Sequence, residues 1–250
     1  MSGHSKWKTN KSRKNAADAK KGAVYTKLIK EITVAAREGG GNSDTNSRLR
    51  AVVAKAKEAN MPSDNVKTAI KRGTGELPGI TYENVAYEAY GPAGVAIFIE
   101  ALTDNKNRTT AELRNIMSKK GGNMAGSGSV SWMFTKKGYL LIDKAQIGEE
   151  ELMSIVLDAG AEDFKSDEKN YEIITAIGDF EKVKEAVQEK NITCQTAEVT
   201  MIPSSLIKVM ANNAKQLLGL IEALEEHDDV QQVYANFDIP DEILEQVALE

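Results

Sequence analysis

The sequence is poor in the residues that build disulfides, zinc sites and acid–base centres. Cys194 is its only cysteine, which excludes a disulfide framework and a thiolate zinc site and fits a reducing compartment. His4 and His227 are its only histidines, and no sequence pattern couples either one to a nucleophile or a carboxylate. We therefore expect a protein that is not an enzyme, with no catalytic residue, no metal and no cofactor.

Long apolar runs are also missing. No run approaches the roughly 18 residues that a membrane span requires, and the N-terminus turns basic without the apolar segment of a secretory signal. We therefore expect a cytoplasmic protein with no membrane partner. Hydrophobic residues still make up 41% of the 250 residues, which is enough to bury cores and predicts more than one domain.

The charges are sorted along the chain. The net charge is -5, but residues 1–75 contain 12 Lys and 5 Arg against 6 acidic residues, whereas the remainder contains 15 basic and 31 acidic residues. A solvated surface would explain an excess of charge, but it explains less well why the two signs are sorted by segment. The basic first third predicts an acidic partner, with nucleic acid as the first candidate. We expect a monomer whose acidic remainder serves as a platform for protein partners.

The basic first third divides into an arm and a helical domain. Residues 1–17 have Trp7 as their only large apolar side chain and no acidic residue, so we expect a flexible basic arm that becomes ordered on a partner. Apolar residues at helical spacing then predict a three-helix domain over residues 18–75. The predicted helices are Asp18 to Gly39, Ser47 to Ala59, and Ser63 to Gly73, the last with Ser63 as its N-cap. The last two are joined by a turn short enough for a helix-turn-helix arrangement.

Beyond residue 80 the apolar period changes to that of strands. Residues 138–202 predict the order β-α-β-β-α-β of a ferredoxin-like domain, which begins with a strand from Tyr139 to Ile142. Residues 80–135 and 204–250 together supply the elements of a second α/β sandwich, the last of which is a predicted strand over residues 230–237. We therefore predict an α+β multidomain fold, in which the three-helix domain precedes two α/β sandwich domains and the ferredoxin-like domain is inserted into the discontinuous domain 80–135 plus 204–250.

Two local features of the middle region bear on function. Thr109 and Glu112 form a capping-box pattern, which predicts a helix from Thr109 to Lys120. The glycine-rich stretch 121–128 follows this helix and precedes a predicted strand over residues 129–134. A phosphate-binding loop has the opposite order, so we expect a helix C-cap and a mobile loop there.

The candidate nucleic-acid-binding residues are basic groups of the first third with polar neighbours. Spaced lysines in the arm suit backbone phosphates, while Trp7 could stack on an exposed base or dock on the protein's own bundle. In the third helix, Asn65, Thr68 and Arg72 lie on one polar stripe, with Lys67 and Lys71 beside it. An ordinary solvated helix face explains any one of these residues nearly as well, but not the whole run. The candidates are Lys6, Trp7, Lys8, Lys11, Arg13, Lys14, Lys20, Lys21, Arg48, Arg50, Lys55, Asn65, Lys67, Thr68, Lys71 and Arg72.

A candidate anion site precedes the helix that is predicted from Thr109. Helix N-terminal amides together with Asn105, Lys106 and Arg108 could hold an anion. The simpler alternative is a polar turn whose Asp and Asn side chains satisfy its own backbone.

Several segments resemble a known family. They are GHSKW at 3–7, DAKKGAVYTKLIKEI at 18–32, RLRAVVAKAKEANMPSDNVKTAIKRGTG at 48–75, YEAYGPAGVAIFIEALTDNKNRT at 87–109 and GGNMAGSGSVSWMF at 121–134. They resemble the YebC/PmpR family, whose mitochondrial relative is the translational activator of cytochrome c oxidase subunit one. Lys106 replaces a frequent Arg of the family, which weakens a bidentate phosphate contact there.

The resemblance implies three domains, a helical one followed by two α/β domains. It implies either a DNA-binding transcriptional regulator or a ribosome-associated translation factor that helps with difficult stretches such as consecutive prolines. Lys and Arg serve DNA and RNA backbones alike, so the residues themselves leave both targets open.

Overall fold

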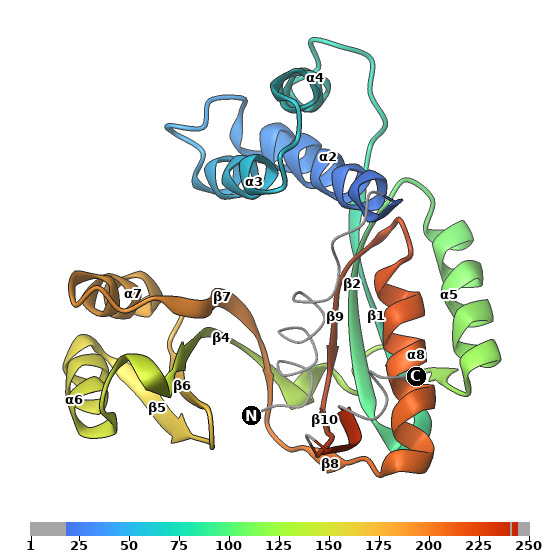
Figure 1. Ribbon diagram of the computed structural model, residues 1–250. Coiled ribbons are helices and arrows are strands. Elements are labelled where there is room, and N and C mark those ends of the chain that lie inside the picture. Colours follow the sequence, from blue (N-terminus) through green and yellow to red (C-terminus); the bar gives the residue numbers. More distant parts are fainter. Residues whose placement is uncertain (1–18, 241, 245–250) are drawn as a thin grey trace. The chain divides into compact units, whose positions relative to one another are not determined.

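The computed structural model describes residues 19–240 and 242–244, with residues 19–21 described as backbone only (Figure 1). The described chain forms two compact units. Among the described residues, the first unit consists of residues 19–129 together with 215–233, and the second consists of residues 130–214 together with 234–240 and 242–244. Within these described ranges, no helix has both the length and the apolar character needed to cross a membrane.

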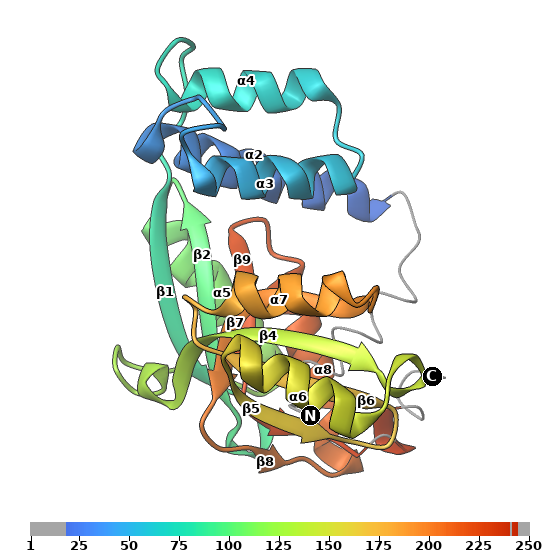
Figure 2. The ribbon, with the colours of Figure 1, turned by 90° about the vertical axis from the view of Figure 1, so that its left-hand side faces the viewer.

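The first unit begins with the three predicted helices, which are confirmed. They are α2 (Ala19–Gly39), α3 (Ser47–Glu58) and α4 (Ser63–Gly73), and Figure 2 shows α4 as the outermost of the three. The helix α2 ends at the glycine run, where Gly40 adopts a φ of 84° that favours glycine. Both α3 and α4 pack on α2. Ile32 of α2, Leu49 and Ala56 of α3, and Ala69 of α4 are fully or almost fully buried in one core.

The start of α4 differs in detail from the prediction. Ser63 is the first helical residue and not the N-cap, because Pro62 occupies the cap position with an extended ψ of 136°. The carbonyl of Pro62 accepts from the amides of Asn65 and Val66, and among the described side chains none caps this helix. The other end of α4 lies close against α2. A Cβ on Gly73 would lie 2.4 Å from the carbonyl oxygen of Thr33, so only glycine permits this approach.

The sheet of the first unit has the order β3-β1-β2-β9. Its strands are β1 (Glu83–Tyr90), β2 (Ala96–Thr103), β3 (Asn123–Met124) and β9 (Val230–Ala235), and a short 3₁₀ turn, η1 (Pro92–Gly94), connects β1 to β2. The antiparallel pairing of β1 with β2 places Tyr87 opposite Ile99. The helices α5 (Lys106–Lys120) and α8 (Ala211–Glu225) cover one face of this sheet (Figure 1). Leu113 and Leu220 from these helices are fully buried.

The helix α5 begins three residues before the predicted start, so the prediction of Thr109 as N-cap was wrong. Asn105 is the N-cap, and its side-chain oxygen accepts from the amide of Arg108 at 3.1 Å. Thr109 lies fully buried in the first turn. The capping box was misplaced because the polar residues before Thr109 have no apolar periodicity, although they extend the helix. As expected, the helix ends at Gly121, which has a φ of 80°.

The second unit has the predicted β-α-β-β-α-β order. Its elements are β4 (Phe134–Asp143), α6 (Glu149–Ala159), β5 (Ala161–Ser166), β6 (Asn170–Thr175), α7 (Phe180–Glu189) and β7 (Cys194–Pro203). The strand order β5-β6-β4-β7 is that of a ferredoxin-like sheet. Leu140 and Ile173 of the sheet pack with Leu152 of α6 and Val183 of α7 in one core. The α+β multidomain fold with a ferredoxin-like component is therefore confirmed.

Three segments at the edges of this unit differ from the prediction. The expected strand over residues 129–134 is a short 3₁₀ turn, η2 (Ser131–Met133), which leads directly into β4. β4 begins at Phe134 and not at Tyr139, because the polar residues Lys136 and Lys137 pair with β7 despite their lack of apolar alternation. The end of the predicted strand 230–237 forms a separate strand, β10 (Phe237–Asp238), which pairs in parallel with β8 (Ile207–Lys208). A further 3₁₀ turn, η3 (Lys144–Gln146), follows β4.

Candidate nucleic-acid interface

The helical domain retains a strong positive charge in its described part. Residues 19–75 contain eight Lys and four Arg against five acidic residues. The structure divides these cations into those on an outward surface and those that hold the fold together. Only the first group is available to a polyanion.

The helix α4 carries the predicted polar stripe on its outer side. Asn65, Lys67, Lys71 and Arg72 are exposed, and Thr68 is half-buried. Among the described residues, Lys67 forms a distant ion pair with Asp64, at 3.7 Å between two strongly exposed side chains, and such a pair contributes little. Because the opposite side of the helix packs on α2, the outer side presents hydrogen-bond donors and positive charge to solvent. We call Asn65, Lys67, Thr68, Lys71 and Arg72 the α4 basic face.

The basic residues of α3 have a mixed placement. Arg48 forms an ion pair with Glu38, and the Arg50 guanidinium donates to the carbonyls of Ser43 and Asp44 at 3.0 and 2.6 Å. Both arginines therefore stabilise the loop between α2 and α3. Lys55 is exposed in the last turn of α3.

Eight of the candidate residues are not placed by the structure. Lys6, Trp7, Lys8, Lys11, Arg13 and Lys14 lie outside the described residues. Lys20 and Lys21 belong to α2, but their side chains also lie outside the described part. All eight stay predictions.

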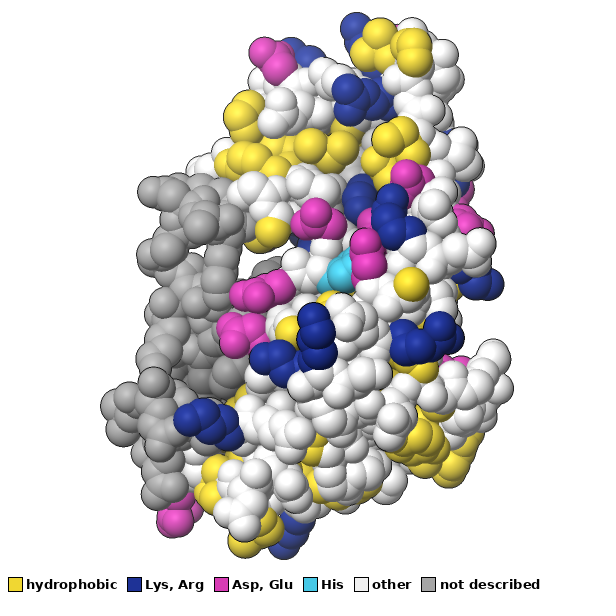
Figure 3. All heavy atoms as spheres, turned by 90° about the vertical axis from the view of Figure 1, so that its right-hand side faces the viewer, with side chains coloured by type: hydrophobic (Ala, Val, Ile, Leu, Met, Phe, Trp, Pro, Cys, Tyr) yellow, Lys and Arg dark blue, Asp and Glu magenta, His cyan; other side chains and the backbone are white. Residues whose placement is uncertain are grey.

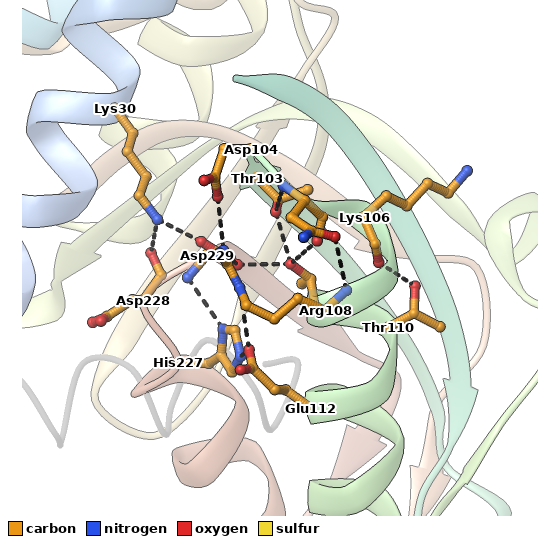
Figure 4. A network of polar contacts seen from close by, with 12 residues as sticks. Lys30, Thr103, Asp104, Lys106, Arg108, Thr110, Glu112, His227, Asp228 and Asp229 are labelled. Atoms are coloured by element: carbon orange, nitrogen blue, oxygen red, sulfur yellow. Dashed lines mark hydrogen bonds and ion pairs between the residues drawn. The ribbon is translucent and has the colours of Figure 1, made fainter. Parts of the chain in front are cut away.

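Two lysines of α2 bind the protein itself, a role that the sequence did not reveal. The Lys27 ammonium donates to the carbonyl of Glu225, at the end of α8. The Lys30 ammonium is buried and donates to the carbonyl of Asp228 at 3.0 Å and to the Asp229 carboxylate at 2.5 Å (Figure 4). Because these partners lie about 200 positions further along the chain, no local pattern could have identified them.

Asp229 is the centre of this polar network. Its carboxylate is buried, with one oxygen bound by Lys30 and the other accepting from the Thr109 hydroxyl at 2.6 Å and the Arg108 guanidinium at 2.8 Å. Burial by itself would raise the pKa of the Asp229 carboxyl, but the hydrogen bonds from Lys30, Thr109 and Arg108 hold this pKa well below its usual range. Asp229 is therefore ionised at neutral pH, and it compensates the charge of the buried Lys30 ammonium.

The candidate anion site is occupied by the protein's own groups. Arg108 donates to Asp229 and, at 2.8 Å, to Asp104, and its hydrogen bonds to these two carboxylates raise the pKa of its guanidinium. The Asn105 side chain caps α5, and Lys106 points away from the network (Figure 4). The structure does not bring the three predicted residues together around one position. The polar-turn alternative describes this geometry better.

His227 completes the network on the outer side. Its Nδ1 accepts from the amide of Asp229 at 3.1 Å, so Nε2 carries the proton and donates to Glu112 at 2.9 Å. Figure 3 shows this face, where acidic and basic side chains surround the histidine. Among the described residues, Glu112, His227 and Asp229 place potential metal-ligand atoms within 4.8 Å of one another. However, Lys30 and Arg108 already occupy the Asp229 oxygens and would repel a cation, so this group is a polar junction and not a metal centre.

The glycine-rich loop after α5 is also arranged around a carboxylate. Glu88 is buried, and its carboxylate accepts from the amide of Gly128 at 2.7 Å, while its carbonyl accepts from the amide of Ala125. An amide that a phosphate-binding loop would direct at its ligand is here bound to the carboxyl group of Glu88. The loop is therefore anchored to β1 through Glu88.

Comparison with known proteins covers nearly the whole chain. Residues 5–76 match the model described as the TACO1/YebC protein N-terminal domain, and residues 82–237 match the TACO1/YebC second and third domain. A protein of Natranaerobius thermophilus named "Probable transcriptional regulatory protein" is 55% identical over 98% of this chain and 99% of its own length. A protein of the same name from Syntrophobacter fumaroxidans is 52% identical over 99% of this chain and its own full length.

A solved structure agrees with these sequence matches. The crystal structure of the conserved hypothetical protein Aq1575 from Aquifex aeolicus is 44% identical, covers 89% of this chain and 92% of its own, and gives a TM-score of 0.76. Both the sequence and the fold thus match one family over almost all of this chain. The protein belongs to the TACO1/YebC family.

Proposed function

We propose that this protein is a nucleic-acid-binding regulator of gene expression, which uses its basic N-terminal third to bind duplex DNA. The observation that carries this proposal is the α4 basic face, which gathers Lys67, Lys71 and Arg72 with two polar side chains on one exposed side of a helix. The relatives named "Probable transcriptional regulatory protein" support a regulatory role. We assign the protein a binding role with no catalytic step.

The chemistry of the α4 basic face suits a polyanion. Lysine and arginine neutralise phosphates and release condensed counterions, while Asn65 and Thr68 can hydrogen-bond to phosphates or base edges. Lys55 adds an exposed cation on α3. The predicted arm would add five further cations over residues 1–17.

RNA is the second candidate target. The same cations would serve ribosomal or messenger RNA, and the family resemblance implies a translational role as well as a transcriptional one. This version predicts co-sedimentation with ribosomes. The DNA version predicts a preference for particular duplex sequences.

The test is a charge-reversal variant with Lys67→Glu, Lys71→Glu and Arg72→Glu. Its matched control reverses three exposed lysines that lie outside the helical domain, Lys119→Glu, Lys182→Glu and Lys190→Glu. Both variants lose the same amount of positive charge. Affinity for promoter duplex, random duplex and ribosomal RNA is measured by fluorescence anisotropy at several salt concentrations.

We expect the α4 variant to lose at least about tenfold in affinity, which corresponds to about 1.4 kcal/mol, while the control stays within about twofold of the wild type. A wild-type preference for promoter duplex over random duplex supports the DNA version. Tighter binding to ribosomal RNA supports the translation version. Equal losses in both variants would mean that only the overall charge matters, and would contradict the assignment to α4.

A further inference from the structure

Polar contacts of α2 attach the helical domain to the sheet of the first unit. Within the described residues, the apolar core of the helical domain is built from residues 25–70 alone. Lys27 and Lys30 reach the turn between α8 and β9, and Arg37 donates to the carbonyl of Tyr82. The connecting segment over residues 74–81 is exposed along its whole length. Charged side chains of α2 therefore contribute directly to the orientation of the helical domain on this sheet.

Asp229 is the most constrained member of this attachment. Its carbonyl accepts from the amide of Leu102 at 2.8 Å, which fixes its backbone to the end of β2. Arg108 and Thr109 fix one carboxylate oxygen to the first turn of α5. The second oxygen is directed at Lys30 of α2 (Figure 4). Asp229 thus joins a rigid sheet and helix to the helical domain.

We propose that Asp229 is a positioning residue for the nucleic-acid interface, because its hold on Lys30 sets the orientation of α2, and with it the α4 basic face, on the sheet. This inference rests on the proposed function. The helices α2 and α4 move together, since Gly73 lies against the backbone of Thr33 and the Thr33 hydroxyl donates to the carbonyl of Ala69 at 3.3 Å. A change at Asp229 is therefore transmitted to α4 as a rotation of the helical domain.

The two partners in this contact are not equivalent. Without Asp229, the buried Lys30 ammonium loses its only carboxylate among the described contacts and is drawn toward water, which weakens the attachment of α2. Without Lys30, Asp229 keeps Arg108 and Thr109 and stays in place. Loss of Asp229 should therefore disturb the domain orientation more than loss of Lys30.

Positioning affects specific binding more than non-specific binding. The phosphate contacts of Lys67, Lys71 and Arg72 need only the α4 surface, whereas recognition of one shape or sequence needs α4 held in register with the rest of the protein. A release of the helical domain should thus lower the ratio of specific to non-specific affinity. The same release should leave the salt dependence of non-specific binding unchanged. A role of Asp229 in folding alone would not lower the specificity ratio while leaving this salt dependence unchanged.

The test compares Asp229→Asn, Lys30→Met and the matched control Asp104→Asn. Asp104 also pairs with Arg108 but has no contact with Lys30 among its described interactions. Spin labels are placed at Glu58→Cys on α3 and Ser118→Cys on α5, two exposed positions, in a Cys194→Ser background that removes the native thiol. Electron paramagnetic resonance then measures the distance distribution between the helical domain and α5. The affinities of the same proteins for promoter duplex and for random duplex are also measured.

We expect one narrow distance distribution for the wild type and for Asp104→Asn, a broad one for Asp229→Asn, and an intermediate one for Lys30→Met. The specificity ratio should fall at least about tenfold in Asp229→Asn. A narrow, wild-type distribution in a folded Asp229→Asn protein overturns the proposal. If Asp229→Asn does not fold, Lys30→Met decides, because a wild-type distribution there overturns the proposal too. If the wild type binds no nucleic acid, the proposed function fails while the distance measurement still reports on positioning.

Discussion

Lys30 and Asp229 are 199 positions apart in the chain, yet the ammonium of one lies 2.5 Å from the carboxylate of the other. Both side chains are almost fully buried. Taking two charges out of water is costly, and the attraction between them compensates this cost only when further hydrogen bonds satisfy the remaining oxygens. Thr109 and Arg108 supply these bonds. The same four residues therefore stabilise the first unit and fix its helical domain.

Replacement of Asp229 should cost more stability than replacement of Lys30. Asp229→Asn leaves a buried cation uncompensated and should lower the free energy of unfolding by about 3–5 kcal/mol. Lys30→Met leaves Asp229 with two donors and should cost about 1–2 kcal/mol. Urea denaturation measures both values. The double variant should lose less free energy of unfolding than the sum of the two single losses. Strictly additive losses would show that the two residues are not coupled.

The contribution of Asp229 should disappear at acid pH. Because its pKa is lower in the folded protein than the ordinary value of 3.8, the folded state binds fewer protons than the unfolded state in the acid range. The stabilisation is complete above about pH 4 and is lost as the pH falls through the folded pKa. The stability gap between wild type and Asp229→Asn should therefore narrow below about pH 4. A gap that stays constant from pH 7 to pH 3 would contradict this ionisation state.

The close approach of α4 to α2 requires glycine at position 73. The Cβ of Gly73→Ala would lie 2.4 Å from a backbone carbonyl, which cannot move as a side chain does, so we expect a loss of about 1–3 kcal/mol. Gly22→Ala on α2 is the control, because no atom of the described residues lies within 4 Å of its Cβ. Alanine should stabilise a helix there by about 0.5–1 kcal/mol. In thermal denaturation, the melting temperature should therefore fall for Gly73→Ala and rise for Gly22→Ala, relative to the wild type.

The start of α5 gives a further prediction. Asn105→Ala removes the N-cap and should lower the free energy of unfolding by about 1 kcal/mol. Asn107 is the second residue of the helix and is exposed, so Asn107→Ala should leave the stability unchanged or raise it slightly. Chemical denaturation separates the two. If Asn107→Ala proves the more costly change, the helix does not begin at Lys106.

Most of the fold followed from local patterns in the sequence. Helical spacing predicted α2 to α4, and the alternating elements of residues 138–202 predicted the ferredoxin-like order. Both succeed because each element buries its own apolar face in a core. The predictions failed where polar residues are held by distant contacts. Thr109 was assigned as a cap because its true partner, Asp229, lies 120 positions away, and Lys136 in β4 pairs with a strand more than 60 positions later.

The candidate interface could be predicted only as a set of basic residues. The polar stripe of α4 follows from helical periodicity, and the structure places it on the outer surface. Periodicity cannot separate a cation that faces solvent from one that supports the fold. Arg48 and Arg50 bind the loop beside them, and Arg108 binds two carboxylates. Their partners became visible only in three dimensions.

The salt dependence of binding tests the central claim most directly. The logarithm of the association constant for a duplex is measured against the logarithm of salt concentration, for the wild type and for Lys67→Glu, Lys71→Glu and Arg72→Glu together. If these side chains bind phosphates, the slope should become shallower by roughly 0.9 for every phosphate that the variant no longer neutralises, or about 2–3 in total. A variant with weaker or equal affinity and an unchanged slope would show that the α4 basic face does not bind the nucleic-acid backbone.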